Sequence, residues 1–82
     1  MGTLAELARQ RKEGLRRLQK ASLNLDAQQE KVEREVKRLL TRKKSIPESS
    51  DMQRVLGLIS NVSTALDGIS QVANDLLQLY GQ

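Results

Sequence analysis

The sequence holds no cysteine, histidine, tryptophan or phenylalanine, and Tyr80 is its only aromatic residue. Without cysteine or histidine it has no disulfide framework, no thiol nucleophile, no imidazole base and no ligand set typical of structural zinc. A single aromatic ring cannot form the stacking platform that binds single-stranded nucleic acid. No apolar run approaches the roughly 20 residues that span a bilayer, so we expect no membrane span.

Motifs for catalysis and cofactor binding are also missing. The five glycines lie far apart, so the sequence contains neither G-x-x-x-x-G-K-[ST] nor G-x-G-x-x-G, the loops that bind phosphates. Its N-terminal carboxylates alternate with lysine and arginine, as on a solvated helix face. We therefore expect a protein that is not an enzyme and has no cofactor or metal. The N-terminus lacks the hydrophobic region of a signal peptide, which favours an intracellular location, cytoplasmic or nuclear.

Pro47, the only proline, divides the chain into two segments of opposite charge. Residues 1–47 hold 13 Lys and Arg and 6 Asp and Glu, whereas residues 48–82 hold 1 and 4. The formal net charge of +4 therefore combines a segment of +7 with one of −3. Proline disfavours the α conformation at the residue before it, so a helix arriving from the N-terminal side should end by about Ile46.

The first segment predicts one long helix over about residues 3–44. Thr3 and Glu6 form a T-x-x-E capping box, and good helix formers dominate the residues that follow. One apolar row recurs at every seventh position: Leu18, Leu25, Val32, Leu39 and Ile46. The row that we expect beside it in a coiled-coil seam is Ala8, Leu15, Ser22, Gln29, Val36 and Lys43. Several members of that second row are polar, so the predicted seam is imperfect.

The second segment predicts a helix over about residues 51–80, after a turn at about residues 45–50. Steps of three and four connect Met52, Val55, Ile59, Val62, Leu66, Ile69, Ala73, Leu76 and Tyr80, as in a coiled-coil seam. The row of every seventh residue from Leu58 to Leu79 is apolar too, so the buried face is too wide for one partner helix. Gly57 and Gly68 weaken the helix, and a break near Gly68 stays open.

A short connection favours antiparallel neighbours, so we expect residues 1–82 to form one all-α domain, an antiparallel helical hairpin. Its surplus apolar surface predicts that the hairpin completes a four-helix bundle by association, as a homodimer or with related helical subunits. We expect its function to be that of a coiled-coil dimerisation or scaffold module of a larger assembly. The predicted interface residues are Val55, Leu58, Ile59, Val62, Leu66, Ile69, Val72, Leu76 and Leu79.

An alternative function is electrostatic binding of polyanions by a basic stripe on the first helix. The candidate ligands are nucleic acid, bound without sequence specificity, acidic protein surfaces or tails, and anionic lipid. The predicted binding residues are Arg9, Arg16, Arg17, Lys20, Lys31, Arg34, Lys37 and Arg38. Ser45 follows a run of three basic residues and is a candidate phosphorylation site for a basophilic kinase.

The stretch Lys12-Glu13-Gly14-Leu15 resembles the Lys-Glu-Gly core of the Rho-binding homology-region-one domains, which are antiparallel coiled-coil fingers. The resemblance covers three residues and the hairpin shape. In that family the stretch lies late in the first long helix, whereas about 30 residues of helical pattern follow it here. The resemblance implies docking of a regulatory protein such as a small GTPase, which is a third alternative.

Overall fold

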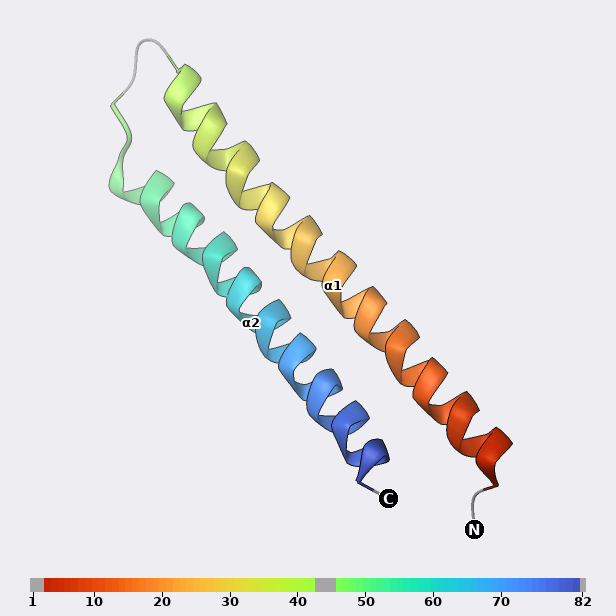
Figure 1. Cartoon of the computed structure of the whole chain (residues 1–82). Coiled ribbons are helices and arrows are strands. Elements are labelled where there is room, and N and C mark those ends of the chain that lie inside the picture. The colour runs from red at the N-terminus through yellow and green to blue at the C-terminus, as the bar shows by residue number, and fades with distance from the viewer. Residues whose placement is uncertain (1–2, 43–45, 82) are drawn as a thin grey trace.

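The structure, a computed structural model, describes residues 3–42 and 46–81. It contains two helices, α1 (Leu4–Thr41) and α2 (Ser49–Tyr80), which lie side by side and run antiparallel. Figure 1 shows the start of α1 and the end of α2 at one end of the rod, with the connection at the other. The described residues thus form an all-helical hairpin, with Cα extents of 65 × 16 × 11 Å.

Side chains satisfy backbone N–H groups at the start of both helices. The Thr3 hydroxyl accepts a hydrogen bond from the Glu6 N–H at 3.1 Å, which confirms the predicted cap of the first helix. At α2, the Asp51 carboxylate accepts a hydrogen bond from the Glu48 N–H at 2.9 Å. α2 begins at Ser49 and continues without a break to Tyr80, so the helix does not end near Gly68.

The two helices meet along a seam in which residues recur in steps of four and three, the spacing of a coiled coil. In α1 and at its C-terminal end, the less exposed residues of this seam are Leu7, Arg11, Gly14, Leu18, Ala21, Leu25, Gln28, Val32, Glu35, Leu39 and Arg42. In α2 they are Asp51, Val55, Leu58, Val62, Ala65, Ile69, Val72, Leu76 and Leu79. Both helices therefore bury one side along almost their whole length.

The seam of α1 differs from the predicted one by one position. The predicted row from Leu18 to Leu39 does lie in the seam, but the row beside it is Gly14, Ala21, Gln28 and Glu35. The predicted second row, from Ala8 to Val36, is exposed, and its largest members Leu15 and Val36 are 53% and 40% exposed. Ile46 lies beyond the end of α1 and is exposed, and Lys43 lies outside the described residues.

The physical reason for this shift is the close approach of the helices at Gly14. A Cβ atom added to Gly14 would lie 2.6 Å from Leu76 Cδ1, closer than two carbon atoms can pack. The missing side chain thus makes room for Leu76, which is buried against α1. At this end of the seam Gly14 lets the helices approach, whereas Leu15, beside it in the predicted row, is left outside.

We predict different effects for alanine at Gly68, which faces open space, and at Gly14, which packs against Leu76. Replacing Gly68 by alanine should raise the free energy of unfolding by roughly 0.5–1 kcal/mol, because alanine favours the helix and nothing lies within 4 Å of the added Cβ. Gly14→Ala should gain less or destabilise the chain, because Leu76 has to move aside. Urea unfolding followed by circular dichroism measures both variants. Equal gains at the two positions would contradict the tight approach at Gly14.

Candidate functional site

The hairpin is a single layer of two helices, so both of its broad sides are open to solvent. On one side Gln29, Val32 and Glu33 of α1 line a shallow groove together with Ile59 and Val62 of α2. We call this side the apolar face. The other side carries three open grooves with polar and basic linings, and we call it the polar face.

The apolar face gathers most of the large apolar side chains that the fold leaves exposed. Seven residues make almost two helical turns, so the row through Gln29 and the row through Ile59 each stay on this side. Leu56 and Leu77 lie three and four residues from members of the Ile59 row and belong to the same side. The exposed large apolar residues of the apolar face are Leu15, Val36, Leu40, Met52, Leu56, Ile59, Leu66, Leu77 and Tyr80.

Among the predicted interface residues, only Ile59 and Leu66 are exposed on the apolar face, and Val62 reaches its groove from the seam. The others are buried or half-buried in the seam with α1: Val55, Leu58, Val62, Ile69, Val72, Leu76 and Leu79. These residues hold the hairpin together, and their contact with a second molecule stays a prediction. Three neighbouring rows of α2 are apolar, so periodicity could not show which of them α1 covers. For the same reason, the sequence did not single out Leu56 and Leu77, which are exposed on the apolar face.

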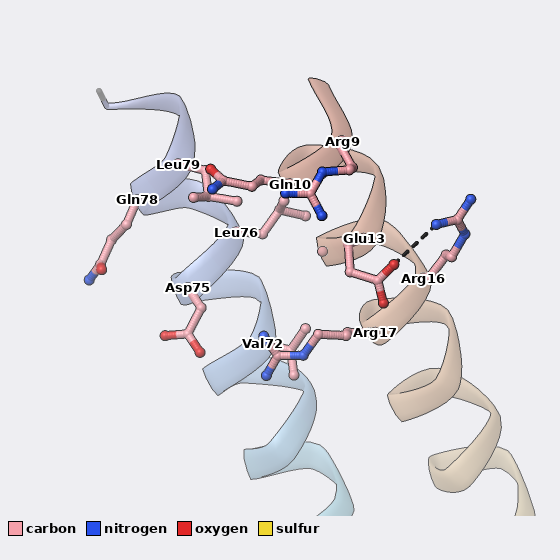
Figure 2. A pocket seen from close by; sticks show the side chains of 11 residues that line it. Arg9, Gln10, Glu13, Arg16, Arg17, Val72, Asp75, Leu76, Gln78 and Leu79 are labelled. Atoms are coloured by element: carbon pink, nitrogen blue, oxygen red, sulfur yellow. Dashed lines mark hydrogen bonds and ion pairs between the residues drawn. The ribbon is translucent and has the colours of Figure 1, made fainter. Parts of the chain in front are cut away.

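The largest groove of the polar face lies beside the close approach of the helices. It encloses about 610 Å³ and is lined by Arg9, Gln10, Glu13, Gly14, Arg16, Arg17, Val72, Asp75, Leu76, Gln78 and Leu79. Figure 2 shows Glu13 paired with Arg16 on α1, with Asp75 on the opposite helix. Guanidinium groups and carboxylates thus surround a small apolar floor, so the groove has no uniform charge.

All residues of the predicted polyanion stripe are exposed on α1. Several of its arginines form ion pairs within the helix: Arg9 with Glu6 at 3.9 Å, Arg16 with Glu13 at 3.0 Å, Arg34 with Glu30 at 3.3 Å, and Arg38 with Glu35. Among the described residues, Arg17, Lys20, Lys31 and Lys37 have no such pair. The positive charge of the stripe is therefore partly offset by its own helix.

Charged residues close the seam at the end where the helices are connected. Glu35 is 7% exposed, accepts hydrogen bonds from Arg38 and lies 3.5 Å from Nε of Arg54 on α2. Arg42 donates a hydrogen bond to Asp51 at 2.8 Å. The hydrogen bond from Arg38 is the main cause that lowers the pKa of Glu35, and the Glu48 N–H is the main cause that lowers the pKa of Asp51. These pairs fix the register of the two helices near the connection.

Three further expectations concern a phosphorylation site, metal binding and a membrane span. Ser45, the candidate phosphorylation site, lies outside the described residues. In the ranges 3–42 and 46–81, no group of carboxylates is placed to hold a metal ion. Neither of the two described helices combines the length and the apolar character needed to cross a bilayer.

The lowered pKa values of Glu35 and Asp51 predict that acid destabilises the hairpin. A carboxyl group with a lower pKa in the folded chain contributes stability above its unfolded pKa, and this contribution is lost as the pH falls through the folded pKa. The free energy of unfolding should therefore decrease as the pH drops below the usual values of 4.5 for Glu35 and 3.8 for Asp51. Urea midpoints from about pH 7 to about pH 3 measure this loss. Glu35→Gln should show a smaller loss, and an unchanged loss would contradict the role of Glu35.

In comparisons with known proteins, no family model matches this chain, and no curated protein or solved structure matches it. The resemblance of Lys12-Glu13-Gly14 to Rho-binding domains is thus without support from relatives. Within this stretch, Gly14 has a packing role of its own against Leu76. The apolar face and the polar face are therefore the features on which a function can be proposed.

Proposed function

We propose that the chain is a non-enzymatic protein–protein interaction module, a dimerisation or scaffold domain of a larger assembly. In this proposal the apolar face packs on another helical hairpin, its own copy or a related subunit, and completes a four-helix bundle. The observation that carries the proposal is the concentration of exposed large apolar side chains on one side of a single helical layer. Contiguous apolar patches of more than a few hundred Å² mark interaction sites on protein surfaces.

The surface of the chain supports an associated state. Its accessible area is 6671 Å², whereas a compact monomer of this mass exposes about 4,900 Å². A protein–protein interface of standard size buries about 800 Å² on each partner. The surplus surface is larger than that, so a second layer of helices has enough area to bury.

The pattern of the apolar face also favours a helical partner. Its central rows, from Ala8 to Val36 on α1 and from Met52 to Tyr80 on α2, contain no charged residue. Residues seven apart form straight rows that interdigitate with similar rows of another helix. A second hairpin would therefore bury these rows as the core of a bundle without leaving charges unpaired in its centre.

We predict that the chain associates in solution and that this depends on the apolar face. The wild-type molar mass, measured by light scattering after gel filtration, should exceed the 9.2 kDa of one chain. Ile59→Ser combined with Leu66→Ser should shift the protein to the monomer, because each side chain loses about 1 kcal/mol of apolar burial in each partner. Circular dichroism should show that helicity is retained, since both residues lie outside the seam.

Leu23→Ser provides the matched control for this prediction. Leu23 is 61% exposed, but it shares its row on α1 with Arg9 and Arg16 and is not on the apolar face. Its substitution removes a similar apolar area and should leave the molar mass unchanged. Equal dissociation by Leu23→Ser and by the pair on the apolar face would show that the apolar face is not the interface.

We propose binding of polyanions as a second function, because basic residues without an ion pair gather on the polar face and the outer side of α1. Arg17 lines one of the polar grooves and Lys31 lines the other two, and neither has an ion pair among the described residues. Positive charges along one side attract phosphate-bearing polymers or acidic tails through release of counterions. The carboxylates on the same helix weaken this attraction, so we rank it below association through the apolar face.

The polyanion proposal predicts an affinity that depends steeply on salt. Binding to a single-stranded oligonucleotide or to polyglutamate should weaken at least tenfold between about 50 and about 200 mM salt, because the release of counterions on binding is less favourable at higher salt. Arg17→Glu with Lys31→Glu should lower the affinity further, whereas Leu23→Ser should not. Fluorescence anisotropy measures both effects. A binding curve that does not change with salt would contradict electrostatic binding.

A further inference from the structure

We infer that the occupant of the apolar face is a second copy of this chain, related by a two-fold axis that runs across the helices. In this arrangement α1 packs antiparallel on α1 of the second copy, and α2 packs antiparallel on its α2. The inference rests on the proposed function, because it names the partner of the same face. A two-fold interface has to be complementary to itself, and the sequence of the apolar face has that property on both helices.

On α2 the exposed side chains are arranged symmetrically about Leu66. Met52 and Tyr80 lie equally far from Leu66 on either side, as do Ile59 and Ala73. The outer row of α2 lies farther from the seam than the row of Leu66. In this outer row Leu56 and Leu77 lie at nearly equal distances from Leu66, with Ser63 and Ser70 between them. Antiparallel packing of α2 on itself would therefore bring apolar residues onto apolar residues at both ends and in the centre.

On α1 the outer row of the apolar face, which is the row farther from the seam, pairs opposite charges about its centre. This row contains Ala5, Lys12, Gln19, Asp26, Glu33 and Leu40, and Glu33 lines the groove of the apolar face. Lys12 and Glu33 lie equally far from the midpoint between Ser22 and Leu23. Antiparallel packing of α1 on itself would thus place Lys12 of each copy near Glu33 of the other, where opposite charges favour association.

The centres of symmetry on the two helices lie at the same level of the hairpin. Gly14 packs against Leu76, and Glu35 forms an ion pair with Arg54. Two residues that face each other across the seam therefore have sequence numbers whose sum is about 90. The midpoint beside Ser22 therefore faces α2 close to Leu66. A single two-fold axis can therefore pass through both centres. Patterns that arose by chance on the two helices would not need to have their centres at the same level.

The other two-fold packing of the same faces is less favourable. An axis parallel to the helices would place α1 of one copy on α2 of the other, so the outer row of α1 would face the outer row of α2. That row of α2 holds only Leu56, Ser63, Ser70 and Leu77. Glu33 would then lose water without gaining a positive partner, which costs free energy. Charge complementarity thus selects the axis across the helices.

A cysteine at the two-fold axis tests this arrangement directly. The chain contains no cysteine, so an introduced cysteine is the only thiol that can react with a cross-linker. Ser22→Cys would place two thiols next to each other across the axis, and a short bis-maleimide should convert most of the protein to a covalent dimer. Ser60→Cys is the matched control, because Ser60 is exposed on the outer side of α2 and should give little covalent dimer.

Charge exchange gives a second test that does not depend on cross-linking. Lys12→Glu or Glu33→Lys alone should weaken the dimer about three- to tenfold, because each substitution sets like charges opposite each other twice in the dimer. The double variant Lys12→Glu with Glu33→Lys restores opposite charges and should recover an affinity within about twofold of the wild type. Sedimentation equilibrium measures the three dissociation constants.

The outcomes separate this inference from the proposed function. A molar mass of two chains, covalent dimers from Ser22→Cys only, and recovery in the double charge variant support the inference. Association that is lost in the Ile59 and Leu66 variant but yields no Ser22 cross-link would overturn the arrangement and leave the proposed function in place. A wild-type mass of one chain would overturn the second copy as the occupant. Association that is unchanged in the Ile59 and Leu66 variant would overturn both proposals.

Discussion

One helix packed against another covers about two rows of its side chains, and α2 has three apolar rows. The rows from Val55 to Leu76 and from Leu58 to Leu79 face α1, which leaves the row from Met52 to Tyr80 in solvent. This limit explains why the hairpin has a seam but no described large side chain that is fully buried. It also explains why one broad side of the hairpin is apolar.

The contacts within the seam decide which side that is. At one end, Gly14 makes room for Leu76, and the Arg11 guanidinium lies 4.2 Å from the centre of the Tyr80 ring. At the other end, ion pairs join Glu35 to Arg54 and Arg42 to Asp51. Pairs of opposite charge and the close packing of Leu76 on Gly14 resist a shift of register along the helices or a rotation about them. The rows of the apolar face are therefore held in one plane.

The polar face differs from the apolar face in its charge. Seven basic residues but only three carboxylates line two of its grooves, so stacking a second hairpin on this side would bring mostly like charges together. Repulsion of this kind discriminates between two ways of associating, in the same way that attraction on the other side does. The basic N-terminal segment thus has a role in either proposed function: it binds polyanions, or it leaves only one side open to a second layer.

The sequence by itself determined that the described chain is two helices joined near Pro47, because capping residues and apolar periodicity act over a few neighbouring residues. It also determined that α2 carries three apolar rows. Only the tertiary structure decided that Gly14, Ala21, Gln28 and Glu35 form the seam in place of the row with Leu15 and Val36. Hydropathy favours the larger side chains for burial, but the distance between two packed helices is set by how closely their backbones can approach. That distance depends on both helices at once, so it cannot be read from either one alone.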